Sequence, residues 1–159
     1  MKKPRMTIWF VLAGVFALIL LGQLALTLSS WRRPDLGVAD GALRPCPASP
    51  NCVCSEEHAT DPEHEIAPLS IDGDPTEEMA RLQRQLMSWP GARLIDSSAT
   101  YLRYEFVTPL VRYVDDVEFR LDPGAGVIHV RSASRVGHSD LGANRKRIEA
   151  IRAAFSAGS

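Results

Sequence analysis

The sequence lacks most of the patterns by which enzymes and cofactor-binding proteins are recognised. It has no Gly-x-Ser-x-Gly nucleophile elbow, no glycine-rich cofactor loop, no internal repeat and no low-complexity tract. Cysteines number only three, without the spacing of ordinary zinc knuckles. We therefore expect neither a cofactor nor a metal ion, and hydrolysis is weakly supported.

The sequence also lacks a strong net charge, with a formal value of −1 over 159 residues. Its charges are unevenly distributed, however. Residues 34–78 carry eleven acids and one arginine, whereas residues 79–159 carry eight acids and twelve Arg or Lys. We expect the acidic segment to pack over the basic one, an interpretation favoured over nucleic-acid binding.

A long uncharged run, from Met6 to Leu28, follows the basic amino terminus. About twenty such residues cross the ~30 Å hydrocarbon layer as a helix, so a bilayer is the expected partner of residues 6–28. Trp9 and Trp31 bracket the run as interface anchors would. A cleavable signal peptide is the alternative, with Thr27-Leu28-Ser29 as a weak cleavage site, but its apolar region is usually shorter. A retained anchor is favoured.

Positive charges flank this run unevenly, with Lys2, Lys3 and Arg5 on one side and Arg32 and Arg33 on the other. The excess at the amino terminus places the short tail inside the cell. The prediction is a single-pass protein of the cell inner membrane with its carboxy-terminal domain in the periplasm. The expected units are a tail and anchor (1–31), an extended arm (32–64) and a folded domain (65–159).

The cysteines cluster in the arm as Cys46, Cys52 and Cys54. An oxidising compartment favours a disulfide, and Cys46 with Cys52 is the preferred pair because a Cys52–Cys54 bridge would be strained. His58 and His64 follow closely, so zinc binding and unpaired thiols remain as alternatives.

Apolar periodicity in residues 65–159 predicts a two-layer α+β domain: an antiparallel meander sheet with helices on one face, preceded by the single transmembrane helix. One helix is expected to begin after Asp74 as its N-cap, and a last helix to begin near Ser139. That last helix would present Leu141, Ile148, Ile151 and Phe155 to the core. The expected strands are 65–71, 93–95, 101–107, 112–121 and 127–132.

Alternation along these strands predicts a polar sheet face opposite the helices that collects Arg103, Glu105, Asp116, Glu118, Arg120, His129 and Arg131. Asp116, Glu118 and His129 are the weak catalytic candidates there, and His129 is expected to be a solvated strand histidine. Asp115 and Asp116, as strand neighbours, point to opposite faces and cannot act on one substrate together without a β-bulge.

The sequence contains three distinctive blocks: Pro45-Cys46-Pro47-x-x-Pro50-Asn51-Cys52-Val53, Tyr113-Val114-Asp115-Asp116-Val117-Glu118-Phe119 and a longer block from Arg131 to Arg147. Together they resemble the domain-of-unknown-function 1499 family. The resemblance covers residues 43–155. It implies a bacterial protein, often exported or membrane-tethered, and carries no established activity. The family usually has Ser or a similar residue at Cys54, which supports the Cys46–Cys52 pair.

The block from Arg131 onward leaves a strand and enters a helix, so it could form a cradle for a carboxylate or phosphate. The predicted ligand-binding residues are Arg131, Ser132, Ser134, Arg135 and Arg145. The competing interpretation pairs Arg131 and Arg135 with Asp115, Asp116 and Glu118 as structural ion pairs.

Two functional hypotheses follow. The first is a membrane-anchored extracytoplasmic module, not an enzyme, that binds an anionic small molecule or an envelope partner protein. The alternative is an envelope hydrolase acting on a phosphorylated or carboxylated component. The observation that distinguishes the two hypotheses is whether the charged face of the sheet forms an open cleft or a closed network of ion pairs.

Overall fold

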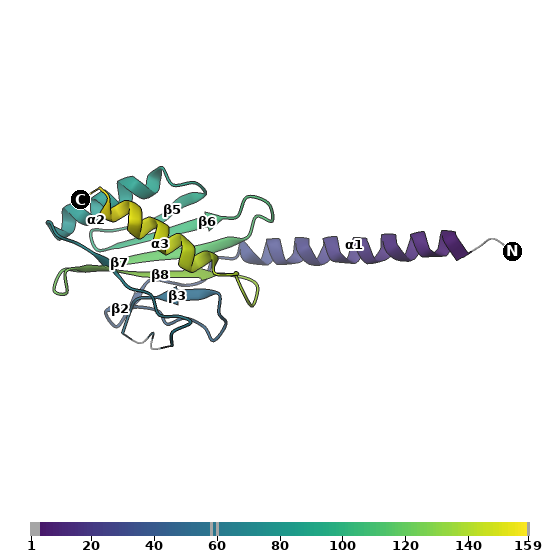
Figure 1. Cartoon of the computed structure of the whole chain (residues 1–159), viewed down its shortest axis with the longest axis horizontal. Coiled ribbons are helices and arrows are strands. Elements are labelled where there is room, and N and C mark those ends of the chain that lie inside the picture. The colour runs from purple at the N-terminus through teal and green to yellow at the C-terminus, as the bar shows by residue number, and fades with distance from the viewer. Residues whose placement is uncertain (1–3, 58, 60, 159) are drawn as a thin grey trace.

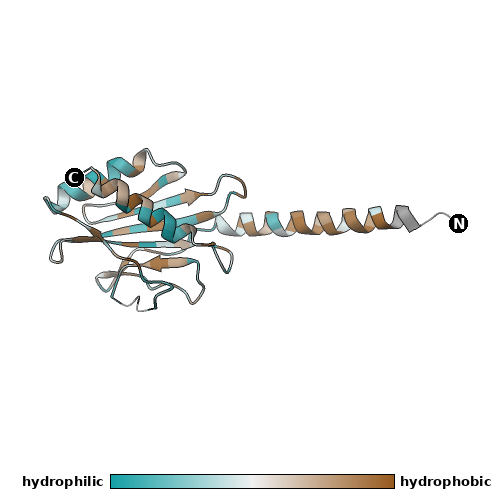
Figure 2. Ribbon diagram, viewed as in Figure 1, coloured by the Kyte–Doolittle hydropathy of each residue, from teal (hydrophilic) through white to brown (hydrophobic). Residues whose placement is uncertain are grey.

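A long helix projects from one end of an α+β domain in the computed structural model, which describes residues 4–57, 59 and 61–158 (Figure 1). Helix α1 (Pro4–Ser30) contains a 23-residue segment, Ile8–Ser30, with a mean hydropathy of 2.4. Its apolar surface is not covered by the domain (Figure 2). Length and composition suit a membrane anchor, although a signal sequence meets the same test. Lys2, Lys3 and the Arg5 side chain, used to predict orientation, lie outside the described part.

The domain is built on a six-stranded sheet in which every pairing of strands is antiparallel. The strand order is β3-β8-β7-β6-β5, and β4 pairs with β8 alongside β3. A separate hairpin joins β1 and β2. The bounds are β1 (Val38–Ala39), β2 (Ala42–Leu43), β3 (Cys52–Cys54), β4 (Leu69–Ser70), β5 (Ala92–Ser97), β6 (Tyr101–Val107), β7 (Val114–Asp122) and β8 (Val127–Ser134). The predicted α+β class is confirmed.

Two helices, α2 (Pro75–Met87) and α3 (Ala143–Ser156), cover one face of the sheet (Figure 1). Asp74 is the N-cap of α2, as predicted, and its carboxylate accepts hydrogen bonds from the backbone of Thr76 and Glu77. Between helices and sheet lies the main apolar core. It includes Met79, Leu82, Leu86, Leu102, Tyr104, Val117, Phe119, Ile128, Val130, Ile148, Ile151 and Phe155.

The opposite face of the sheet is covered by the first part of the arm, residues 33–47. Strand β3 of the arm pairs with β8, so the arm and residues 65–159 share one sheet. The Glu56 carboxylate joins the two, because it accepts from the Leu43 backbone (2.9 Å) and from Arg120 (2.8 and 2.9 Å). The acidic arm therefore packs over the basic half, with Glu56 as a buried ionic contact.

The start of the last helix differs from the prediction. Helix α3 begins at Ala143, because Gly142 has a φ of 77° and the Asp140 carboxylate accepts from the Asn144 amide at 2.6 Å. Ser139 is therefore not its N-cap. Leu141, expected in the apolar stripe, is 87% exposed, and Asn144 is buried with Ile148, Ile151 and Phe155 instead.

Strand β6 has its predicted ends, whereas the other expected strands occur with shifted ends. The strand predicted over residues 65–71 is reduced to β4, preceded by an isolated bridge between Glu65 and Cys54. Pro68 has no N–H to donate, which limits this strand at its start. Strand β8 extends two residues beyond its predicted end, to Ser134, because its last residues pair with both β7 and β3.

Candidate functional site

Charged side chains on the arm-facing side of the sheet form a buried cluster rather than a solvated polar surface. Strand pairing places Glu105 opposite Asp116 and Glu118 opposite Arg131. All four residues are at most 6% exposed, because the segment from Ser30 to Glu56 covers them. Of the two arrangements expected from sequence, the closed ion network is the one observed at these carboxylates.

Asp116 is held by two arginines. Arg103 donates to its Oδ1 from Nε (3.2 Å) and Nη2 (2.9 Å). Arg135 donates from Nε to Oδ2 (2.6 Å) and from Nη2 to Oδ1 (2.7 Å), which is a bidentate contact. Both carboxylate oxygens of Asp116 are therefore occupied.

Glu105 shares one of these arginines. Its Oε1 accepts from Arg135 Nη2 and from Arg33 Nε, both at 2.8 Å. Burial opposes ionisation, but the hydrogen bonds from Arg33 and Arg135 bring the pKa of Glu105 below its ordinary value. Burial likewise opposes the charge of Arg135, and its bonds to Asp116 and Glu105 raise its pKa. Each partner thus stabilises the charged form of the other.

Glu118 completes the cluster. Its Oε2 accepts from Arg131 Nη1 at 3.1 Å, and its Oε1 accepts from the Tyr101 hydroxyl (2.7 Å) and the Gly37 amide (2.9 Å). Burial and the neighbouring Glu118 charge raise the pKa of Tyr101, which keeps this phenol protonated as a donor.

A cavity of about 370 Å³ lies between this cluster and the carboxy-terminal end of α1. Its lining contains four arginines and a single carboxylate: Arg32, Arg33, Arg131, Arg135 and Asp116, with Ser29, Pro34, Leu36, Pro47, Ala133 and Ser134. Arg135 Nη1 donates to the Ser30 carbonyl (3.1 Å) and so ties the cavity to the helix. The buried Nε of Arg131 has no hydrogen-bond partner within the described ranges.

The five residues predicted to bind a ligand do not converge on one point. Arg131, Ser134 and Arg135 line the cavity, but the Ser134 hydroxyl accepts from Asn144 Nδ2 (3.0 Å) on the helix side. Ser132 is fully buried there and donates to Asn144 Oδ1 (2.6 Å). Arg145 reaches the carbonyls of residues 62, 63 and 65. Alternation along β8 separates the serines from Arg131.

Sequence reasoning missed Arg32 and Arg33 as site residues, treating them only as charges flanking the anchor. Their position beside Arg131 and Arg135 depends on how α1 docks on the domain, for which the sequence carries no signal. It also missed Arg147, whose Nη2 donates to Asp115 Oδ2 at 2.5 Å on the helix face. The expected separation of Asp115 and Asp116 onto opposite faces is confirmed.

The catalytic candidates lie in two places. Asp116 and Glu118 belong to the ion cluster, whereas His129 lies with Arg120 and Glu56 near a second cavity of about 480 Å³. His129 is not solvated as expected: its side chain is 12% exposed, and its Nδ1 is 3.1 Å from the Ser55 carbonyl and 3.6 Å from Glu56 Oε2. Strand β3 and the residues after it cover this histidine.

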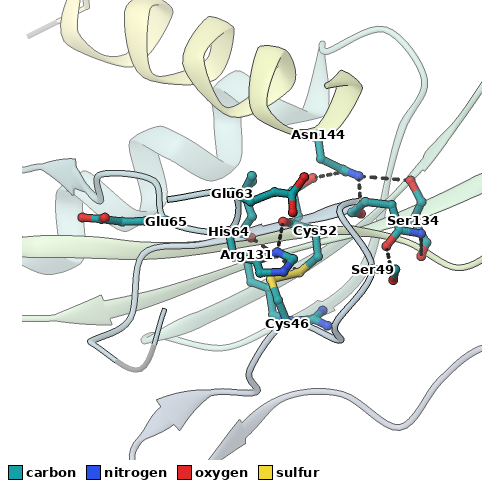
Figure 3. Close-up of a disulfide and its surroundings, with 12 residues drawn as sticks. Cys46, Ser49, Cys52, Glu63, His64, Glu65, Arg131, Ser134 and Asn144 are labelled. Atoms are coloured by element: carbon teal, nitrogen blue, oxygen red, sulfur yellow. Dashed lines mark hydrogen bonds between the residues drawn. A yellow bond between two sulfur atoms is a disulfide. The ribbon is translucent and has the colours of Figure 1, made fainter. Parts of the chain in front are cut away.

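The predicted disulfide joins Cys46 and Cys52, with 5.6 Å between their Cα atoms (Figure 3). His64 Nδ1 lies 2.9 Å from the Cys52 carbonyl, and Cys54 is buried. Burial raises the pKa of the Cys54 thiol. His58, part of the alternative zinc hypothesis, lies outside the described residues. Asp61, Glu63 and His64 bring potential ligand atoms within 4.8 Å of one another, a group without cysteine.

Fold and site together define a class: an α+β domain with a buried arginine and carboxylate cluster, joined directly to a long apolar helix. The model of the family described as protein of unknown function DUF1499 matches residues 42–155, and the chain belongs to that family. The match confirms the resemblance found in the sequence motifs and leaves α1 outside it. No curated protein and no solved structure gives a significant match.

Proposed function

We propose that this protein is a membrane-anchored, extracytoplasmic module that binds an anionic group in the cavity lined by Arg32, Arg33, Arg131 and Arg135. One observation supports this most: four arginines but only one acidic residue, Asp116, line the cavity. Guanidinium groups are the preferred partners of phosphate and carboxylate oxygens.

The charge balance of the cluster supports the same conclusion. Three buried carboxylates, from Glu105, Asp116 and Glu118, are contacted by four arginines: Arg33, Arg103, Arg131 and Arg135. Arg32 adds a further positive charge at the cavity. An anion there would offset this excess and could accept from the unpartnered Arg131 Nε, whose burial without a hydrogen bond is otherwise unfavourable.

The contacts within the cluster disfavour the alternative of an envelope hydrolase. A general base must be within reach of the proton that it abstracts from its substrate. Asp116 and Glu118 are buried, and each of their carboxylate oxygens already accepts at least one hydrogen bond within the domain. His129 lines a different cavity from Asp116 and the four arginines. Binding is therefore the function that the geometry favours.

Location outside the cytoplasm is supported by the disulfide, because such bonds persist in oxidising compartments. The apolar helix α1 supports retention in a membrane. Cell fractionation with protease added to spheroplasts tests both points. We expect the full-length chain in the membrane fraction and the domain digested from outside. A shortened soluble product would contradict anchorage, and a domain protected in intact spheroplasts would contradict the orientation.

Anion binding is tested by the melting temperature of the full-length protein in detergent, with inorganic phosphate as the probe. A ligand that binds only the native state raises this temperature, by linkage. Sodium chloride at matched ionic strength controls for screening. We expect phosphate to raise the melting temperature beyond the chloride value.

Arg32→Gln is the informative variant, because Arg32 is exposed and lines the cavity, so its loss should leave the fold intact. We expect it to reduce the phosphate shift, whereas Arg93→Gln, at an exposed position on β5, should not. No shift beyond that of chloride, or a shift unchanged in Arg32→Gln, would contradict the proposed site.

A further inference from the structure

The loop between β6 and β7, residues 108–113, lies along the last two turns of α1. The Tyr113 hydroxyl donates to Gln23 Oε1 (3.0 Å), Thr27 Oγ1 donates to the Val111 carbonyl (3.1 Å), and Trp31 Nε1 donates to the Arg112 carbonyl (3.2 Å). Gln23 and Trp31 are separated by about 12 Å along a helix. The loop therefore follows the helix over that length.

These contacts set the depth of the loop relative to a membrane. Gln23 and Thr27 belong to the apolar segment Ile8–Ser30, whose length is close to the ~30 Å of a hydrocarbon layer. Groups bonded to Gln23 and Thr27 thus lie at or below the level of the lipid headgroups. The β6–β7 loop is held at the surface of the membrane that α1 spans.

Backbone groups at the two ends of the loop are hydrogen-bonded within the protein, as polar groups in that layer must be. The Thr108 amide donates to the Tyr113 carbonyl, and the Tyr113 amide donates to Thr108 Oγ1, both at 2.9 Å. The Arg112 amide donates to the Thr108 carbonyl (3.2 Å), and Pro109 has no amide to satisfy. The carbonyls of Val111 and Arg112 accept from α1.

The side chains at the tip of the loop are apolar and uncovered. Leu110 is 91% exposed and Val111 is 36% exposed. Leu141, 87% exposed, lies in the β8–α3 loop at the same end of the domain (Figure 1). Thr108 and Pro109 share a cavity with Ala143, the first residue of α3, so the β6–β7 loop lies near the point where the β8–α3 loop ends. Leu110 and Leu141, the two most exposed large apolar residues of the domain as described, therefore belong to loops at the end from which α1 emerges.

Two further residues mark the boundary with the headgroups. Trp31 follows the apolar segment, where tryptophan prefers the membrane interface. The Arg112 guanidinium carbon lies 5.9 Å from the centre of the Trp31 ring. The Arg112 charge would lie at the level of the lipid phosphates, and the neighbouring apolar tip of the loop would lie at the level of the acyl chains. This is the order of the layers in a phospholipid leaflet.

We propose that residues 108–111 form a second membrane contact, in which Leu110 and Val111 insert into the phospholipid leaflet that α1 crosses. This inference rests on the membrane anchorage in the proposed function. The domain is then held against the bilayer at two points, with the arginine cavity at the level of the headgroups.

Fluorescence quenching tests this contact in the full-length protein reconstituted in phosphatidylcholine nanodiscs. Leu110→Cys carries an environment-sensitive NBD label, and lipids with a nitroxide near the headgroup act as the quencher. Ala125→Cys, in the exposed turn between β7 and β8 at the opposite end of the domain, is the matched control. Mass spectrometry checks for single labelling, since Cys54 is buried and the other cysteines are bonded.

We expect a blue-shifted emission and loss of intensity for the Leu110 probe, and neither for the Ala125 probe. A probe at Leu18, exposed on α1, reports on anchorage through lipids with a nitroxide deep in the acyl chain. If the Leu18 probe is quenched and the Leu110 probe behaves like the Ala125 probe, the second contact is refuted while anchorage stands. If the Leu18 probe is not quenched, anchorage fails and both proposals fall.

Discussion

Removing the Arg135 guanidinium should destabilise the domain more than removing any exposed arginine. Its side chain is 4% exposed and donates to Asp116, Glu105 and the Ser30 carbonyl. In Arg135→Ala, Asp116 retains only Arg103 and Glu105 retains only the half-exposed Arg33. Two buried carboxylates would then be incompletely compensated.

The expected loss of unfolding free energy is about 3–5 kcal/mol, the range for breaking a buried ion pair from one side. Arg131→Ala should fall in the same range, because Glu118 is fully buried and would lose its one ion-pair partner among the described residues, keeping only the neutral donors Tyr101 and the Gly37 amide. Arg93→Ala, at an exposed position, should stay within about 0.5 kcal/mol of the wild type.

Urea unfolding of the full-length protein in detergent, followed by near-ultraviolet circular dichroism, measures these differences. A double variant with Asp116→Asn gives the coupling energy between Asp116 and Arg135. A loss below about 1 kcal/mol in Arg135→Ala, the value typical of exposed pairs, would refute the view that this network stabilises the domain.

Two further predictions concern the disulfide and acid. Cys52→Ala should lower the free energy of unfolding by about 2 kcal/mol, since the closed loop is short, and peptide mapping without reduction should recover Cys46 and Cys52 linked. Stoichiometric zinc bound to the cysteines, without a disulfide, would contradict this prediction. The pKa values of Glu56 and Glu105 are lowered, so their contribution is present above the ordinary glutamate pKa of about 4.3 and is lost as pH falls below it. The urea concentration at the unfolding midpoint, measured at pH 7, 5 and 3, should fall as the pH is lowered. In Glu105→Gln this fall should be smaller. An equal fall in the variant and the wild type would contradict the assigned role of Glu105.

Local sequence patterns were sufficient for the elements whose causes are local. Asp74 and Pro75 start α2 because capping involves residues within one turn. Strand β6 was predicted with its correct ends, since its alternation and the proline at position 109 are both visible in the chain. Ser139 was wrong as a cap because Asp140, one residue later, provides the acceptor and Gly142 adopts the left-handed conformation that starts α3.

The candidate site could be predicted only in part. Alternation identified Glu105, Asp116, Glu118 and Arg131 as residues of one face, because side chains in a strand point to the two faces in turn. It did not indicate that the arm would bury them, and it grouped Ser132 with Arg131 although they point apart.

The sequence by itself thus determined the apolar helix, the strand periods, the family and the cysteine pair, all of which depend on composition, spacing or neighbouring residues. Only the tertiary structure decided which charges meet. Arg33 lies 72 residues from Glu105 along the chain, and Arg135 lies 105 residues from Ser30. Contacts over such separations are set by how the arm and α1 dock on the sheet, through the combined packing of many side chains, and no single segment of the sequence specifies them.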